Sequence, residues 1–198
     1  PNGGVLVAMG DDHTGESSTA LHQSEYALID SMIPIFSPAG VQELLDFGVL
    51  GWELSRFAGV WVGLKCMKDT VEVTEVVDGS VERIEVKKPV FSFPEEGVQI
   101  RTNDLAAIQE ERLHKVKVPA VKAFARANNL NKVVFSKEGA KIGLVSAGKS
   151  WLDTVHALDL LGINEPKAKE LGISTFKVGL VWPLEEETLV EWASGLDL

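Results

Sequence analysis

The eight residues GLVSAGKS, at positions 143–150, match the P-loop pattern G-x-x-x-x-G-K-[ST] at every required position. In a P-loop the first glycine directly follows the strand, so that the backbone N–H groups after it can cradle two phosphates. Here the apolar strand expected over 141–146 contains Gly143, which leaves only Ala147 and Gly148 to turn into the next helix. Such a turn is too tight to wrap two phosphates. We therefore expect no nucleotide hydrolysis at this motif.

The residues of this motif have simpler expected roles in a strand–turn–helix unit. Gly148 is expected to provide the turn, Ser150 to cap the helix and Lys149 to be solvated. The first-turn N–H groups of the helix can still hold a carboxylate or a single phosphate. The strand after the motif ends in GLVWP, without the aspartate that helps to hold magnesium in P-loop enzymes. A small P-loop nucleotide-binding protein stays open as an alternative, as does a non-catalytic assembly module.

A second polar stretch, residues 11–24, follows the first expected strand. It is long and contains glycine, as functional loops do, and ligands of open parallel sheets sit beyond the carboxyl ends of the strands. Its start, Asp11-Asp12-His13, carries metal-ligand side chains. Three adjacent side chains seldom converge on one ion, however, so we expect a solvated turn or an Asx cap. We assign no metal ligand and no catalytic residue from the sequence.

The composition excludes several classes of function. A net charge of -10 argues against nucleic acid, whose phosphates require a basic face. The one cysteine, Cys66, cannot hold an iron–sulfur cluster or form an internal disulfide, and we expect it to be buried and structural. No apolar run approaches the roughly 18 residues that a membrane span needs, and no signal peptide is present. We expect a cytoplasmic protein without a membrane partner.

The elements that must position these residues alternate between strand and helix. Strands are expected over 5–9, 32–36 and 60–65, because these runs are short and almost entirely apolar, with helices over 20–31 and 38–57 between them. Short links between such elements mean right-handed crossovers and a parallel sheet. The fold class is therefore α/β.

The middle of the chain has a different texture. VEVTEVV and VERIEV alternate apolar and charged residues around Asp78-Gly79, which predicts a β-hairpin with one solvated face. A helix is expected over 104–128, kinked or restarted by Pro119.

A second α/β unit is expected after this connector, with strands over 141–146 and 174–182 and helices over 151–161 and 183–192. The predicted domain organisation is a partial parallel-sheet unit over 1–70, a β-hairpin and helical connector over 71–130, and a second partial unit over 131–198.

Two sets of motifs carry a family resemblance that covers essentially the whole chain. GGVLVAMGDDHTGESSTALHQSEYA, followed by IPIFSPAGVQELLDFG and WVGLK, resembles the pyrimidine-binding domain of 2-oxoacid:ferredoxin oxidoreductases, in particular of indolepyruvate ferredoxin oxidoreductase. KIGLVSAGKSWLDTVHALDLLGI and FKVGLVWPLEEETLVEWASGLDL resemble the transketolase-C-terminal-like domain that follows it in this family. The resemblance implies that residues 1–70 are the C-terminal part of the first domain and 131–198 the N-terminal part of the second.

The resemblance also implies an activity. Enzymes of this family oxidatively decarboxylate an aryl 2-oxoacid, transfer the acyl group to coenzyme A and pass the electrons to ferredoxin. They use thiamine diphosphate with magnesium, and iron–sulfur clusters. The family's catalytic glutamate, diphosphate motif and cysteine clusters match no residues here, so this chain alone is expected to hold none of these cofactors and to lack turnover.

The resemblance implies a substrate-binding role for His22, Gln23 and Ser24. In related enzymes the corresponding loop bears an arginine that faces the substrate carboxylate, whereas no arginine stands at these positions. A surface histidine near a helix N-terminus is the other interpretation of His22.

The expected partners are the remaining domains or subunits of the same enzyme, together with ferredoxin and coenzyme A. The chain starts directly before a strand and stops directly after a helix, which suggests an internal fragment of a longer polypeptide. A truncated parallel sheet has an open edge, so we expect self-association through that edge.

Overall fold

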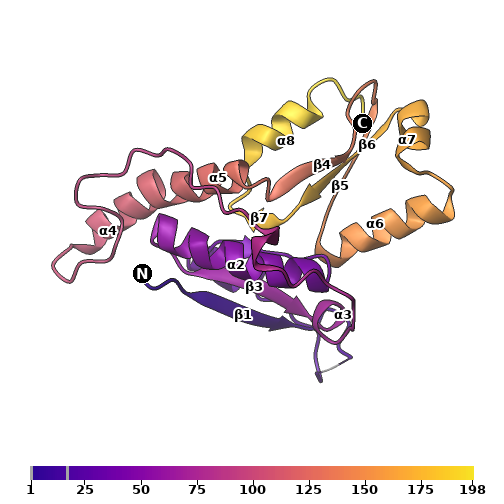
Figure 1. The fold of residues 1–198 in the computed structure, drawn as a ribbon. Coiled ribbons are helices and arrows are strands. Elements are labelled where there is room, and N and C mark those ends of the chain that lie inside the picture. The colour runs from indigo at the N-terminus through magenta and orange to yellow at the C-terminus, as the bar shows by residue number, and fades with distance from the viewer. Residues whose placement is uncertain (1, 17) are drawn as a thin grey trace.

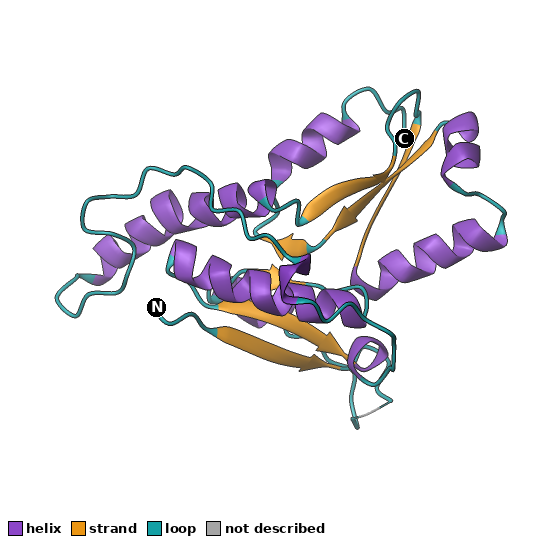
Figure 2. Ribbon diagram, viewed as in Figure 1, coloured by secondary structure: helices purple, strands orange, loops and turns teal. Residues whose placement is uncertain are grey.

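The computed structural model describes residues 2–16 and 18–198. It contains two sheets, one of four strands and one of three, with helices around both (Figures 1 and 2). The predicted α/β class is confirmed.

The first sheet has the strand order β1-β3-β2-β7. Strands β1 (Leu6–Asp11), β3 (Val62–Met67) and β2 (Ile35–Phe36) run parallel, as expected from their apolar sequences. Helices α1 (Glu25–Asp30) and α2 (Val41–Ala58) connect them. Parallel alignment places the carboxyl ends of all three strands along one edge of the sheet, which is the edge where ligands bind in folds of this kind.

The main core lies between the first sheet and α5 (Val118–Ala127), with α2 sandwiched between them (Figure 1). α2 buries one face against the strands, and α5 packs on its opposite side. Fully buried side chains such as Phe36, Leu54 and Phe124 each contribute about 2 kcal/mol through removal of apolar surface from water. This layer makes the first sheet a rigid base for the loops at its carboxyl edge.

The predicted β-hairpin is wrong. After α3 (Lys68–Val71), the described residues up to 105 form no strand, and their only regular element is a 3₁₀ turn, η1, at Val81–Arg83. The segment lies over α2 and α5 instead, where Ile84, Val86 and Phe91 pack individually on the core. These three side chains are therefore partly buried by helices without a partner strand, whereas Val76 and Val81 of the alternating pattern are exposed.

Polar side chains fix this segment to the helices. Asp78 donates its backbone N–H to Gln42 at 2.8 Å, and Arg83 contacts Asp46 at 2.9 Å. Asp78 also accepts the backbone N–H of Ser80, so the Asp-Gly pair forms an Asx turn rather than a hairpin turn.

The helical connector is broken near Pro119, as the sequence predicts. Helix α4 (Ala106–Arg112) passes through a π-helical turn, η2 (Leu113–Lys117), into α5, and Pro119 lies in the first turn of α5. Because the residues before Pro119 keep helical backbone angles, its missing N–H falls inside a continuous helical stretch, directly after the π-helical turn.

The second sheet has the order β4-β6-β5. Strands β5 (Ile142–Ala147) and β6 (Ile173–Val178) run parallel, and β4 (Asn131–Phe135) is antiparallel to β6. Helices α6 (Gly148–Leu160), α7 (Glu165–Leu171) and α8 (Glu186–Ala193) pack on it. The sequence did not predict α7, and the strand predicted over 174–182 is divided into β6 and β7 at Gly179.

The two sheets are joined by β7 (Leu180–Trp182), which leaves the second sheet and pairs antiparallel with β2 of the first. Beside this crossing, the Lys177 side chain of β6 pairs with Glu43 of α2 and lies 5.8 Å from the ring centre of Trp151 in α6. The second unit is therefore packed against the first. Among the described strands β1 pairs only with β3, so the sheet edge at β1 is open, as predicted, whereas the β2 edge is covered.

Within the part of the chain that the structure describes, every helix is too short or too polar to cross a membrane.

Candidate functional site

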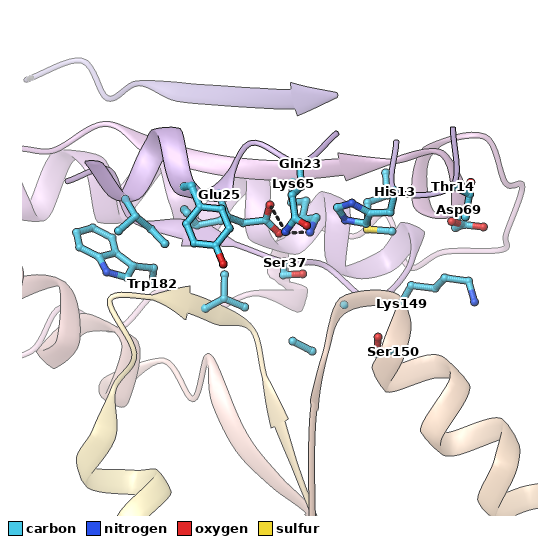
Figure 3. A pocket seen from close by; sticks show the side chains of 17 residues that line it. His13, Thr14, Gln23, Glu25, Ser37, Lys65, Asp69, Lys149, Ser150 and Trp182 are labelled. Carbon is cyan, nitrogen blue, oxygen red and sulfur yellow. Dashed lines mark hydrogen bonds and ion pairs between the residues drawn. The ribbon is translucent and has the colours of Figure 1, made fainter. Parts of the chain in front are cut away.

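A cavity of about 570 Å³ opens between the carboxyl edge of the first sheet and the second unit (Figure 3). Residues far apart in the sequence meet here: the loop after β1, the start of α1, the ends of β2 and β3, the β5–α6 turn and β7. The lining residues are His13, Thr14, Gln23, Glu25, Tyr26, Ile29, Ile35, Ser37, Lys65, Met67, Asp69, Ala147, Gly148, Lys149, Ser150, Val181 and Trp182.

The β5–α6 turn contains the GKS part of the P-loop-like motif. This turn leaves no residue between the strand and the helix. Gly143 lies inside β5, and α6 begins at Gly148 directly after the strand. Gly148 has φ +53°, and a Cβ there would stand 2.5 Å from the Ser37 hydroxyl oxygen. The turn thus needs glycine both for its backbone conformation and for its contact with the first sheet. No phosphate-sized ring exists between β5 and α6.

The other residues of the motif have local roles. Lys149 pairs with Asp153 at 2.7 Å, one turn further along α6, at a partly exposed position. Ser150 lies inside the first turn of α6 rather than at its cap, which is Ala147, so the predicted capping role of Ser150 is wrong. The early start of the helix at Gly148 is the reason.

The loop after β1 is organised by two buried aspartates. Asp12 accepts the backbone N–H groups of Glu16 at 3.1 Å and Ser18 at 2.8 Å, as an Asx cap does. Asp11 accepts the Ser24 hydroxyl at 2.6 Å and the Ser24 backbone N–H at 3.2 Å. The predicted Asx cap is present, but the prediction of a solvated turn is wrong because both carboxylates are buried.

The three residues with a predicted substrate-binding role are separated by the structure. His22 is exposed, and its ring bonds to the Gly10 carbonyl at 2.8 Å, which raises the pKa of His22. It lines a shallow depression outside the cavity. Ser24 anchors the loop through Asp11. Only Gln23 reaches the cavity wall, where its amide contacts Glu25 at 3.4 Å.

The cavity has polar residues that the sequence reasoning missed. Lys65, near the end of β3, is buried and pairs with Glu25 at the start of α1 (Figure 3). A lysine inside the otherwise apolar run VWVGLK was the available signal. The lining also contains the apolar side chains of Ile35, Val181 and Trp182. β7 brings Trp182 to the site through a long-range crossing that no local pattern encodes.

The chain does not fit an iron–sulfur cluster, because such clusters need several thiolates and Cys66 is its single cysteine. Burial and the nearby Asp11 also raise the pKa of the Cys66 thiol, which disfavours the ligating thiolate. For thiamine diphosphate, the one glutamate among the described residues of the cavity wall, Glu25, is paired with Lys65.

The fold places the molecule in a known structural class. The chain is similar to a solved structure of 2-oxoglutarate:ferredoxin oxidoreductase from Magnetococcus marinus, determined with 2-oxoglutarate, coenzyme A and succinyl-CoA bound. The TM-score is 0.60 over 94% of this chain and 39% of that chain, at 14% identity. This likeness concerns the fold alone.

Sequence comparison finds more particular relatives. Residues 132–198 match the model of the indolepyruvate oxidoreductase domain. Indolepyruvate oxidoreductase subunit IorA of Methanothermobacter marburgensis is 24% identical over 195 residues, which are 98% of this chain and 30% of that protein. IorA of Pyrococcus abyssi is 27% identical over 180 residues, 86% of this chain and 27% of the relative. The predicted resemblance to indolepyruvate ferredoxin oxidoreductases is thereby confirmed, and the chain spans about 30% of the length of these relatives.

Proposed function

We propose that this chain is part of an enzyme that oxidatively decarboxylates aryl 2-oxoacids of the indolepyruvate type. In this reaction the acyl group passes to coenzyme A and the two electrons to ferredoxin. The observation that carries the proposal is the cavity at the carboxyl edge of a parallel sheet, in a chain whose fold and sequence match this family.

The cavity provides complementary walls for an aryl 2-oxoacid. Val181 and Trp182, both partly exposed, offer apolar surface to the aromatic ring. Also in the lining, the Lys65 ammonium and the Gln23 amide can donate hydrogen bonds to the carboxylate. Lys65 takes the place of the arginine that the family uses, although from β3 rather than from the loop after β1. Its pairing with Glu25 keeps it positioned and lowers the net charge of the wall.

The other assignments follow from the same proposal. Residues 1–70 correspond to part of a pyrimidine-binding-like domain, 71–130 to a connector and 131–198 to part of a transketolase-C-terminal-like domain. Thiamine diphosphate, magnesium and the clusters are held by the remaining domains or subunits, because this chain lacks residues that fit them. When bound, thiamine diphosphate supplies the carbanion chemistry. This chain then contributes the shape, the apolar surface and the charges of the substrate side.

The test is turnover of the enzyme assembled from this chain and its remaining domains or subunits. Indolepyruvate- and coenzyme A-dependent reduction of ferredoxin is expected, with arylpyruvates turned over in preference to 2-oxoglutarate. Trp182→Ala is expected to raise the KM for indolepyruvate by about 10-fold or more, since it removes an apolar contact worth roughly 1–3 kcal/mol. The matched control is Trp61→Ala, which removes an exposed tryptophan outside the cavity.

If the two tryptophan substitutions raised the KM equally, the proposal that this cavity binds the 2-oxoacid would be contradicted. An assembled enzyme with no arylpyruvate-dependent reduction of ferredoxin, but with turnover of another 2-oxoacid, would contradict the substrate class.

A further inference from the structure

Three side chains with metal-ligand atoms converge where β1 ends. Asp11 is the last residue of β1, His13 stands two positions later in the loop, and Glu25 begins α1. Each offers one ligand atom, and these three atoms lie within 4.8 Å of one another. The adjacent residues Asp11, Asp12 and His13 alone predict no metal site. The third ligand, Glu25, comes from the start of α1, where the chain folds back beside the end of β1.

The spacing is close to that of a metal centre. Metal bonds to nitrogen and carboxylate oxygen are about 2.0–2.2 Å long, so two ligand atoms on a tetrahedral ion stand about 3.3–3.6 Å apart. Side-chain rotations that bring the three atoms up to about 1.3 Å closer together complete such a site. One imidazole and two carboxylates suit a divalent transition-metal cation such as Zn²⁺, whereas Mg²⁺ prefers oxygen ligands alone. His13 and Glu25 also line the cavity, which leaves a coordination position open towards it.

Both carboxylates already have orienting partners. The two hydrogen bonds from Ser24 hold Asp11, and Gln23 and Lys65 contact Glu25. Carboxylates that bind metals are supported by hydrogen bonds of this kind. By contrast, no residue in the described part of the chain hydrogen-bonds to the His13 ring, so a ring nitrogen is available as a ligand.

Lys65 is the natural competitor of a bound cation. Its ammonium group contacts Glu25, so with a neutral His13 the charges of Asp11, Glu25 and Lys65 add up to about -1. A divalent cation must either share Glu25 with Lys65 or displace it. Like charges at this separation repel by roughly 1 kcal/mol or more even in a solvent-like medium. Removal of the lysine charge should therefore strengthen cation binding, whereas loss of a ligand should weaken it.

We propose that Asp11, His13 and Glu25 bind a divalent transition-metal cation of the Zn²⁺ class, with an affinity set by Lys65. This ion is distinct from the magnesium that accompanies thiamine diphosphate, which the proposed function assigns to other parts of the enzyme. The site does not depend on the proposed function, since the three ligands belong to this chain.

The experiment is a titration of the tag-free 198-residue chain with Zn²⁺ by calorimetry, and with Co²⁺ by visible absorption. One ion per chain is expected, with the d–d bands of a low-coordinate Co²⁺ site. His13→Ala is expected to weaken binding by at least about 10-fold, because it removes a ligand from a site where even supporting residues matter that much. His22→Ala is the matched control: it removes the exposed imidazole of the same loop and should leave the affinity unchanged.

The variant Lys65→Met gives a second test, because it is expected to increase the affinity for Zn²⁺. A misfolded protein would not bind Zn²⁺ more tightly. Zn²⁺ should bind this variant more tightly by about 5-fold or more, given the repulsion it removes. The proposal is overturned by equal losses in the two histidine variants, by binding that His13→Ala leaves intact, or by weaker binding to Lys65→Met.

Discussion

Two strand ends face the same cavity, and they differ in the length of chain that follows them. After β1, a loop of 13 residues (12–24) connects the strand to α1. After β5, by contrast, helix α6 begins at the next residue. The long loop brings His13 and Gln23 to the cavity beside Glu25, and it places His13 and Glu25 near Asp11 at the end of β1. The short turn carries the P-loop-like sequence, yet its Gly148 lies against Ser37 and its Lys149 pairs with Asp153 of the same helix.

The comparison shows that the geometry between strand and helix decides what a motif can bind. The residues GKS at the start of a helix supply a lysine and a hydroxyl both in a P-loop and in the tight turn of this protein. Without residues between strand and helix, no ring of backbone N–H groups forms around a phosphate. The unremarkable loop, by contrast, has the length needed to fold back and gather polar side chains at one point.

The largest loss of stability is expected when a side chain is introduced at Gly148 in the tight β5–α6 turn. Gly148→Val should destabilise the protein by about 4 kcal/mol, because a β-branched residue is strained at φ +53° and its Cβ collides with Ser37. Chemical unfolding measures this loss. Gly48→Ala in α2 is the control: its Cβ meets no atom within 4 Å, and the substitution should stabilise the helix by about 0.5–1 kcal/mol. A Gly148→Val protein as stable as the wild type would show that the turn is not closed.

The second largest loss of stability is expected from the ion pair between Lys177 of β6 and Glu43 of α2, which joins the second unit to the first. Lys177→Met leaves Glu43 partly buried without its partner and should cost about 3 kcal/mol. Burial lowers the pKa of Lys177, which fits a lysine whose charge depends on this one carboxylate. The double variant Lys177→Met with Glu43→Gln should recover more than half of the loss in the same unfolding assay. Additive losses would mean that the two side chains do not act as a pair.

A third strand end, between β7 and α8, is fixed by the buried carboxylate of Glu185. Although burial opposes its charge, hydrogen bonds from Thr188 and Arg126 keep the pKa of Glu185 below its usual value. Glu185→Gln should cost about 1–2 kcal/mol at neutral pH. A lowered folded-state pKa means stability that is present above the unfolded-state pKa and lost as pH falls through the folded-state value. The difference between variant and wild type should therefore shrink on acidification, and a constant difference would contradict this account.

The smallest effect is expected in the long loop. Ser24→Ala removes the hydroxyl that donates to Asp11 and should cost about 1 kcal/mol. Because the loop is tied down locally, amide hydrogen exchange should accelerate over residues 12–24 but not at the β5–α6 turn. Acceleration at both places would show that the two strand ends are not independent.

Sequence patterns predicted the parts that local chemistry determines. The parallel core of β1, β2 and β3 follows from short apolar runs, and the break near Pro119 follows from proline geometry. The predicted hairpin is wrong because an alternating pattern does not specify a strand partner. In the segment 72–105, Ile84, Val86 and Phe91 pack singly on the core, whereas Val76 and Val81 stay exposed.

The candidate site was predictable only in part. Gln23 lies in the predicted loop, but Lys65, Glu25 and Trp182 come from three other elements that meet through the tertiary fold. The β7 crossing that delivers Trp182 pairs residues 35 and 182, and no local signal marks such a contact.

The most direct test of the central claim is an NMR titration of the chain with ¹⁵N-labelled tryptophan and glycine. The account predicts that indole-3-pyruvate shifts the Trp182 indole signal, whereas Mg-ATP shifts neither that signal nor the Gly148 amide. Saturable Mg-ATP shifts at Gly148, with no response of Trp182 to the 2-oxoacid, would contradict it and restore the nucleotide-binding interpretation.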